Sequence, residues 1–84
     1  MDANKINHDG GLPPYRQLAA ILAGRIARGE LARRLPSEKN LAQEYGVAQS
    51  TVRKALALLR EAGLVRTHKG WGSEILEPRD RRSD

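Results

Sequence analysis

A chain of 84 residues is long enough for one small domain and too short for two, so an enzyme-sized active-site pocket is not expected. Its 15 lysines and arginines outnumber the 10 acidic residues, and the net charge of +5 favours an anionic partner such as a nucleic acid. The chain has no cysteine, which excludes disulfides and zinc fingers, and no apolar run approaches the ~20 residues of a membrane span.

Both ends of the chain are polar. Residues 1–12 contain two adjacent glycines, and residues 77–84 read Glu-Pro-Arg-Asp-Arg-Arg-Ser-Asp. Segments of this composition bury too little apolar surface to offset the entropy that is lost when they become ordered. We therefore expect disordered tails over residues 1–12 and 77–84, and one folded domain over residues 13–76.

Two helices are predicted in the first half of this domain. The first follows Pro13 and Pro14, which suit a helix start, and its apolar residues recur at three- and four-residue steps until Gly29. The second begins after Ser37, whose hydroxyl can accept a hydrogen bond from a free amide of the first turn, and it runs to Tyr45.

A third helix follows after only residues 46–48. Two helices joined by so short a turn must cross steeply, which is the geometry of a helix-turn-helix, and the later helix is then presented outward. The third helix ends near Gly63, and its apolar stripe has the spacing i, i+3, i+4, i+7: Val52, Ala55, Leu56 and Leu59.

The last part of the domain has strand character. Residues 64–68 and 73–76 flank the sequence Lys69-Gly70-Trp71-Gly72, which predicts two short strands joined by a glycine-rich turn. An isolated hairpin is only marginally stable, so we expect Leu64, Val65 and Ile75 to pack on the helices. The predicted fold is mainly α with a small β-hairpin, a winged helix-turn-helix of three helices plus a wing.

Seven short motifs, in order and at matching spacing, resemble the DNA-binding domain of the GntR family, over nearly all of residues 14–76. They are Tyr15-Arg16-Gln17-Leu18, Gly29-Glu30-Leu31, Arg34-Leu35-Pro36-Ser37-Glu38, Leu41-Ala42, Gly46-Val47, Thr51-Val52-Arg53-Lys54-Ala55-Leu56 and Gly63-Leu64-Val65. The resemblance implies a bacterial transcriptional regulator, with repression favoured over activation. It also implies sequence-specific binding of double-stranded DNA, with the third helix in the major groove and the wing in the minor groove.

The outward face of the third helix supplies five candidate DNA contacts. Ser50 and Lys54 lie opposite the apolar stripe, and Gln49 and Arg53 share a neighbouring ridge. The resemblance implies base and phosphate contacts for Gln49, Ser50, Thr51 and Arg53. For Lys54, an ordinary solvated lysine is an equally good interpretation.

Four further candidates lie outside the third helix. Lys39, in the first turn of the second helix, matches a phosphate-contacting position of the family, the alternative being a solvated lysine. Lys69, Gly70 and Trp71 occupy the predicted wing tip, where a glycine backbone and a cation can approach the minor groove. Trp71 has two equal interpretations, stacking on DNA or folding back on the core.

The chain departs from the family pattern at three places. The connection from Leu31 to Arg34 is shorter than usual, and Glu74 stands where the family commonly has an aromatic or apolar residue. At the start of the third helix the family has Ser or Thr followed by Arg, whereas this chain has Ala48 and Gln49. A glutamine amide matches the N7 and exocyclic amine of adenine, so we expect adenine where arginine-bearing relatives favour guanine.

One helix-turn-helix reads only a few base pairs, so we expect a homodimer on an inverted-repeat operator. No nucleophile–base pair or set of convergent carboxylates is recognisable, and we expect neither an enzyme nor a bound metal or other cofactor. We expect a cytoplasmic protein, because residues 1–11 lack the apolar core of a signal peptide. A winged-helix module for protein–protein interaction is the alternative, and RNA binding is a weaker third possibility.

Overall fold

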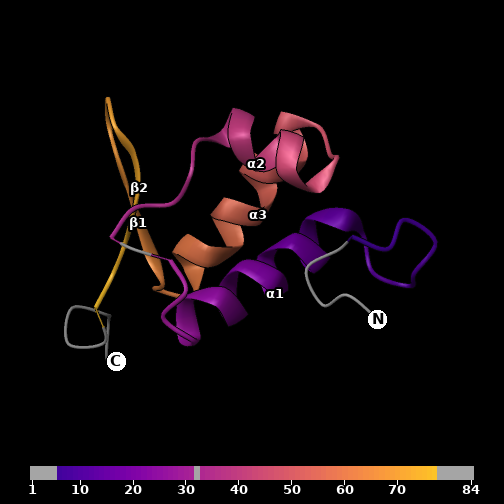
Figure 1. Cartoon of the computed structure of the whole chain (residues 1–84), viewed down its shortest axis with the longest axis horizontal. Coiled ribbons are helices and arrows are strands. Elements are labelled where there is room, and N and C mark those ends of the chain that lie inside the picture. Colours follow the sequence, from indigo (N-terminus) through magenta and orange to yellow (C-terminus); the bar gives the residue numbers. More distant parts are fainter. Residues whose placement is uncertain (1–5, 32, 78–84) are drawn as a thin grey trace.

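The computed structural model describes residues 6–31 and 33–77, which form three helices followed by a two-stranded hairpin (Figure 1). The helices are α1 (Pro14–Ala27), α2 (Glu38–Tyr45) and α3 (Gln49–Glu61). The strands are β1 (Val65–His68) and β2 (Gly72–Ile75), which pair in antiparallel fashion. The predicted order of three helices and a hairpin is therefore confirmed, with strand ends shifted by one residue.

The ends of the helices follow from local chemistry. The Ser37 hydroxyl accepts a hydrogen bond from the backbone amide of Asn40 at 3.1 Å, which is the cap expected for α2. Gly46 follows the last residue of α2, and its left-handed backbone (φ 66°) favours glycine. Ala48 precedes α3 and provides no side-chain cap. The backbone amides in the first turn of α3 therefore receive no hydrogen bond from the side chain of this residue.

The apolar core lies where the three helices meet. The predicted stripes face one another there, and the side chains of Leu18, Leu22, Leu41 and Val52 are fully buried. Val65 of β1 is also buried, and Leu64 and Ile75 pack partly buried against the same core, as expected for the wing. The core therefore holds α3 by its inner face and leaves the outer face of this helix exposed to solvent.

A backbone pairing that the sequence pattern does not predict joins residues 33–35 to β2. The amide of Leu35 donates to the Ser73 carbonyl at 3.0 Å, and the amide of Ile75 donates to the Arg33 carbonyl at 2.7 Å. Between these bonds Arg34 and Glu74 form an antiparallel bridge. β2 is thus the middle of three paired segments, and the connection into α2 is attached to the wing.

Residues 6–12 form a loop that Gln17 of α1 holds through its side-chain amide. The Gln17 Oε1 accepts from the amide of Asn7 at 2.6 Å, and its Nε2 donates to the carbonyls of Asn7 and Leu12, each at 2.7 Å. Residues 1–5 of the predicted N-terminal tail and residues 78–84 of the predicted C-terminal tail lie outside the described residues. The division into a domain and two tails stays a prediction.

Candidate nucleic-acid interface

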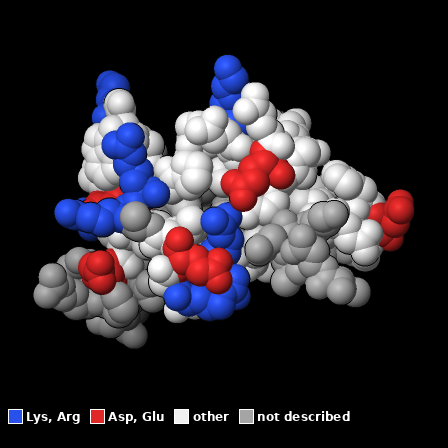
Figure 2. All heavy atoms as spheres, in the orientation of Figure 1, with Lys and Arg blue, Asp and Glu red and all other residues white. Residues whose placement is uncertain are grey.

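An open groove of about 780 Å³ separates the wing from α2. The beginning of α2, including Lys39, lines one side, and Gly70 and Trp71 of the wing turn line the other. Leu56 and Arg60 line it from α3, which lies between the wing and α2 in Figure 1. Figure 2 shows Lys and Arg side chains on the two projections that flank the hollow, one over the wing and one over α2. The groove is therefore suited to a polyanion.

The first turn of α3 presents the predicted base-reading residues outward. Gln49 is the first residue of the helix, and Gln49 and Ser50 are exposed, whereas Thr51 is half-buried. Arg53 follows one turn after Gln49 and is 61% exposed. The structure thus places Gln49, Ser50 and Arg53 together on an accessible end of α3, outside the groove itself.

Arg53 has a partner that the sequence pattern does not reveal. Its Nε lies 3.2 Å from the Oε1 of Glu38, the first residue of α2. This exposed ion pair joins the first residue of α2 to the second turn of α3. Glu38 is also among the residues that line the groove.

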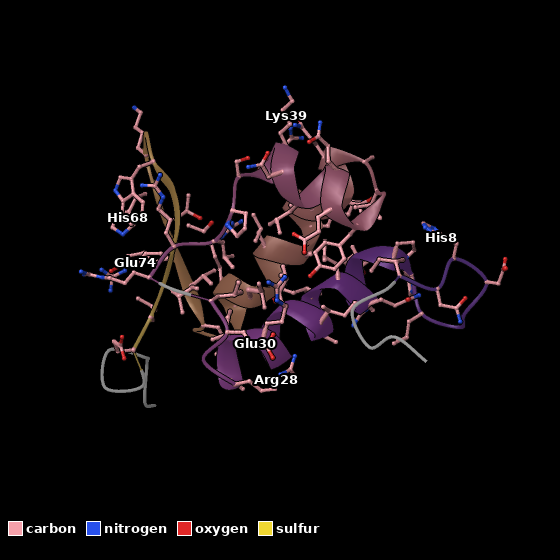
Figure 3. All side chains as sticks on the ribbon, viewed as in Figure 1. His8, Arg28, Glu30, Lys39, His68 and Glu74 are labelled. Atoms are coloured by element: carbon pink, nitrogen blue, oxygen red, sulfur yellow. The ribbon has the colours of Figure 1, made fainter. Side chains whose placement is uncertain are left out.

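The two candidate lysines of the helices have different surroundings. Lys39 projects from α2 into solvent at the edge of the groove (Figure 3). Lys54 is exposed, but its ammonium lies 5.8 Å from the centre of the Tyr15 ring of α1. A cation at this distance is attracted by the face of the ring, so Lys54 is held toward α1.

Trp71 packs on the wing itself. Its ring stacks on the His68 ring, with centroids 4.3 Å apart and planes 15° from parallel, and the Arg34 guanidinium lies 5.1 Å from its centre. Trp71 as a whole residue is 39% exposed and is not part of the helical core, so the core-packing alternative is wrong. Lys69 and Gly70, the neighbouring residues of the turn, are exposed.

Glu74 occupies the outer side of the hairpin, away from the helices, together with His68 (Figure 3). The His68 Nε2 lies 2.7 Å from the Glu74 Oε1. This hydrogen bond holds the pKa of the Glu74 carboxyl below its ordinary value, and the nearby charges of Arg66 and Arg33 act in the same direction. A carboxylate is tolerated at this position because it has these polar partners and faces away from the core.

The groove is also lined by residues outside the predicted set, among them Arg34, Arg60 and Thr67. Arg34 belongs to a motif that carries the family resemblance, which could have identified it. Arg60 donates from Nη1 to the Thr67 Oγ1 at 3.1 Å and so connects the last part of α3 to β1. Arg60 and Thr67 are seven residues apart in different elements, so helical or strand periodicity does not bring them together.

Two classes of site receive no support within the described ranges. Residues 6–31 and 33–77 hold no cluster of three or more His, Cys, Asp or Glu side chains that could bind a metal ion. In the same part of the chain, no helix has the length and apolar character required to cross a membrane.

The chain is similar to proteins of known class. The family model described as "Bacterial regulatory proteins, gntR family" matches residues 14–75. The mannosyl-D-glycerate transport/metabolism system repressor MngR of Escherichia coli (strain K12) is 42% identical over 72 residues, which are 83% of this chain and 30% of MngR. The chain spans about a third of the length of the curated relatives that it matches.

Solved structures show the same fold. YtrA from Sulfolobus acidocaldarius, a GntR-family transcription factor, matches with a TM-score of 0.80 at 32% identity, covering 90% of this chain and 82% of that one. AraR(DBD) in complex with operator ORX1 matches with a TM-score of 0.76 at 28% identity, covering 84% of this chain and 94% of that one. These structures confirm the predicted winged-helix fold.

Proposed function

This chain belongs to the gntR family of bacterial regulatory proteins, and we propose that it binds a specific double-stranded DNA operator in the cytoplasm to repress transcription. Its activity is then DNA recognition and not catalysis. The repressor name of MngR and the operator-bound structure of AraR(DBD) support the proposal. The name describes MngR and the bound operator belongs to AraR(DBD), and we extend repression and operator binding from these proteins to this chain.

The observation that carries the proposal is the groove between α2 and the wing. In winged helices of this class the recognition helix enters the major groove, and the wing reaches the minor groove. A phosphodiester strand separates the two DNA grooves, so it must pass between the two protein elements that enter them. The groove is lined by Leu56 and Arg60 of the recognition helix α3 as well as by the wing, and with Lys39 and Arg60 it has the position and charge to hold that strand.

Salt dependence tests this proposal. If Lys39, Lys69 and Arg60 each neutralise a phosphate, log affinity should fall with log salt with a slope of about −0.9 per contact. Three contacts weaken binding about 40-fold between 50 and 200 mM salt. We expect Lys39→Gln to make the slope shallower by about 0.9. Fluorescence anisotropy of a labelled duplex measures the slope.

Arg28→Gln is the matched control, because it removes one positive charge on the opposite side of the molecule from Lys39 (Figure 3). It should leave the slope unchanged. Affinity for DNA that does not depend on salt contradicts the phosphate contacts. Failure to bind duplex DNA or heparin at moderate salt would instead favour the alternative function, a protein-interaction module.

We also propose that two copies bind one inverted-repeat operator. Among the described residues, Leu12 and Trp71 are the large apolar side chains that are exposed, which is little surface for a stable free dimer. We therefore expect a monomer in free solution and two chains per duplex on DNA. Selection of bound duplexes from a random pool should return an inverted repeat, and sedimentation should give the stoichiometry. A tight dimer without DNA, or protection of a single half-site, would contradict this.

A further inference from the structure

The pair formed by Glu38 and Arg53 lies where α2 and α3 meet the proposed DNA surface. The Arg53 Nε and the Glu38 Oε1 are 3.2 Å apart, and the side chains are 61% and 37% exposed. An ion pair this exposed adds little to folding stability. A carboxylate on a surface that receives phosphates also opposes binding. Neither folding stability nor general affinity for DNA therefore explains why Glu38 is there.

The chemistry of the guanidinium suggests what the carboxylate does. Arginine has five N–H donors in one plane, and the contact to Glu38 uses the Nε side. The end-on edge, made of one N–H from each Nη group, is a different edge from the Nε side, and such a pair of parallel donors matches the O6 and N7 acceptors of guanine. Because a negative charge already accompanies the guanidinium, its net attraction for phosphate is reduced.

We infer that Glu38 is a positioning residue, which holds Arg53 so that its Nη groups read a guanine instead of neutralising a phosphate. The inference rests on the proposed DNA binding and specifies how one part of that interface works. Arg53 follows Gln49 by one helical turn, about 5.4 Å, and base pairs are spaced about 3.4 Å along the duplex. The guanine therefore lies one or two base pairs from the base that Gln49 contacts.

The test compares two duplexes: one selected by the wild-type chain from a random pool, and a scrambled duplex of the same composition. The ratio of the two affinities at fixed salt measures specificity. Arg53→Gln should lower this ratio at least 10-fold and remove the preference at one base pair. Glu38→Gln should lower the ratio about 5-fold and weaken the preference at that same base pair, while affinity for the scrambled duplex rises.

Glu38→Asp separates position from charge. It keeps the negative charge but shortens the side chain by one methylene, so the ratio should fall while affinity for the scrambled duplex stays unchanged. Glu61→Gln, at the last residue of α3, removes the same charge elsewhere on the helix and should leave the ratio at the wild-type value. Thermal melting of each variant verifies that the fold is retained.

The double variant Glu38→Gln/Arg53→Gln gives the decisive comparison. If Glu38 acts through Arg53, the ratio of the double variant equals that of Arg53→Gln alone. The inference is overturned if both Glu38 variants keep the wild-type ratio, or if the two substitutions lower it by independent factors. Those results leave the proposed function intact, whereas failure of the wild-type chain to bind any selected duplex overturns the function itself.

Discussion

Arg53→Glu should abolish operator binding while the domain stays folded. The substitution removes the guanidinium from the outward face of α3 and places a second carboxylate beside Glu38, where DNA phosphates approach. Lost contacts and like-charge repulsion should weaken binding at least about 100-fold, or about 2.7 kcal/mol. Arg53 is exposed and lies off the apolar stripe, so the melting temperature should change by less than about 5 °C.

Gel shift with the selected duplex and thermal melting by circular dichroism check the two halves of this prediction. Arg28→Glu makes the same change in charge on the side of the molecule opposite Lys39 and should weaken binding only slightly, through the net charge. Retained affinity in Arg53→Glu contradicts the DNA contact. A large fall in melting temperature would show that the Glu38–Arg53 pair is structural.

Gln49→Arg should change the preferred base of one half-site position from adenine to guanine. Gln49 is exposed at the first residue of α3, so either side chain can reach a base edge without disturbing the core. The glutamine amide offers one donor and one acceptor, whereas an arginine fork offers two donors. The shift in preference should be about 1 to 3 kcal/mol, the usual contribution of one good bidentate contact.

Binding of both proteins to duplexes varied at each half-site position measures the shift. Ala48→Ser is a useful control because it supplies the missing cap of α3 without altering Gln49. It should strengthen binding to every duplex alike, since it orders the first turn of α3 and leaves the base preferences unchanged. If no position changes its preferred base in Gln49→Arg, Gln49 does not contact a base edge.

Much of the fold could be predicted from local sequence patterns. The helices follow from apolar residues at helical spacing, and their ends follow from Pro14, Ser37 and Gly46, whose effects act over a few residues. The same patterns place Gln49 and Arg53 on the outer face of α3. These features depend on the backbone of a single element, which is what periodicity describes.

The remaining features depend on how separate elements meet. The strand pairing of residues 33–35 escapes prediction because a segment so short has no alternating pattern. The contact between Glu38 and Arg53 depends on the crossing of α2 and α3. The position of Trp71 depends on His68 and on Arg34, which is 37 residues away. Charge and composition give no information on such side-chain partners.

The pairing of both residues 33–35 and β1 with β2 makes the helix-turn-helix an insertion in the three-stranded arrangement. The chain leaves one flank of β2, forms α2 and α3, and returns to the other flank about 10 Å away, two inter-strand spacings. A segment with its ends anchored so closely can be transplanted as a cassette. Residues 36–64 could then be exchanged between two members of this family while the inward-facing apolar residues are kept. The recipient domain would take on the operator specificity of the donor and keep its own wing.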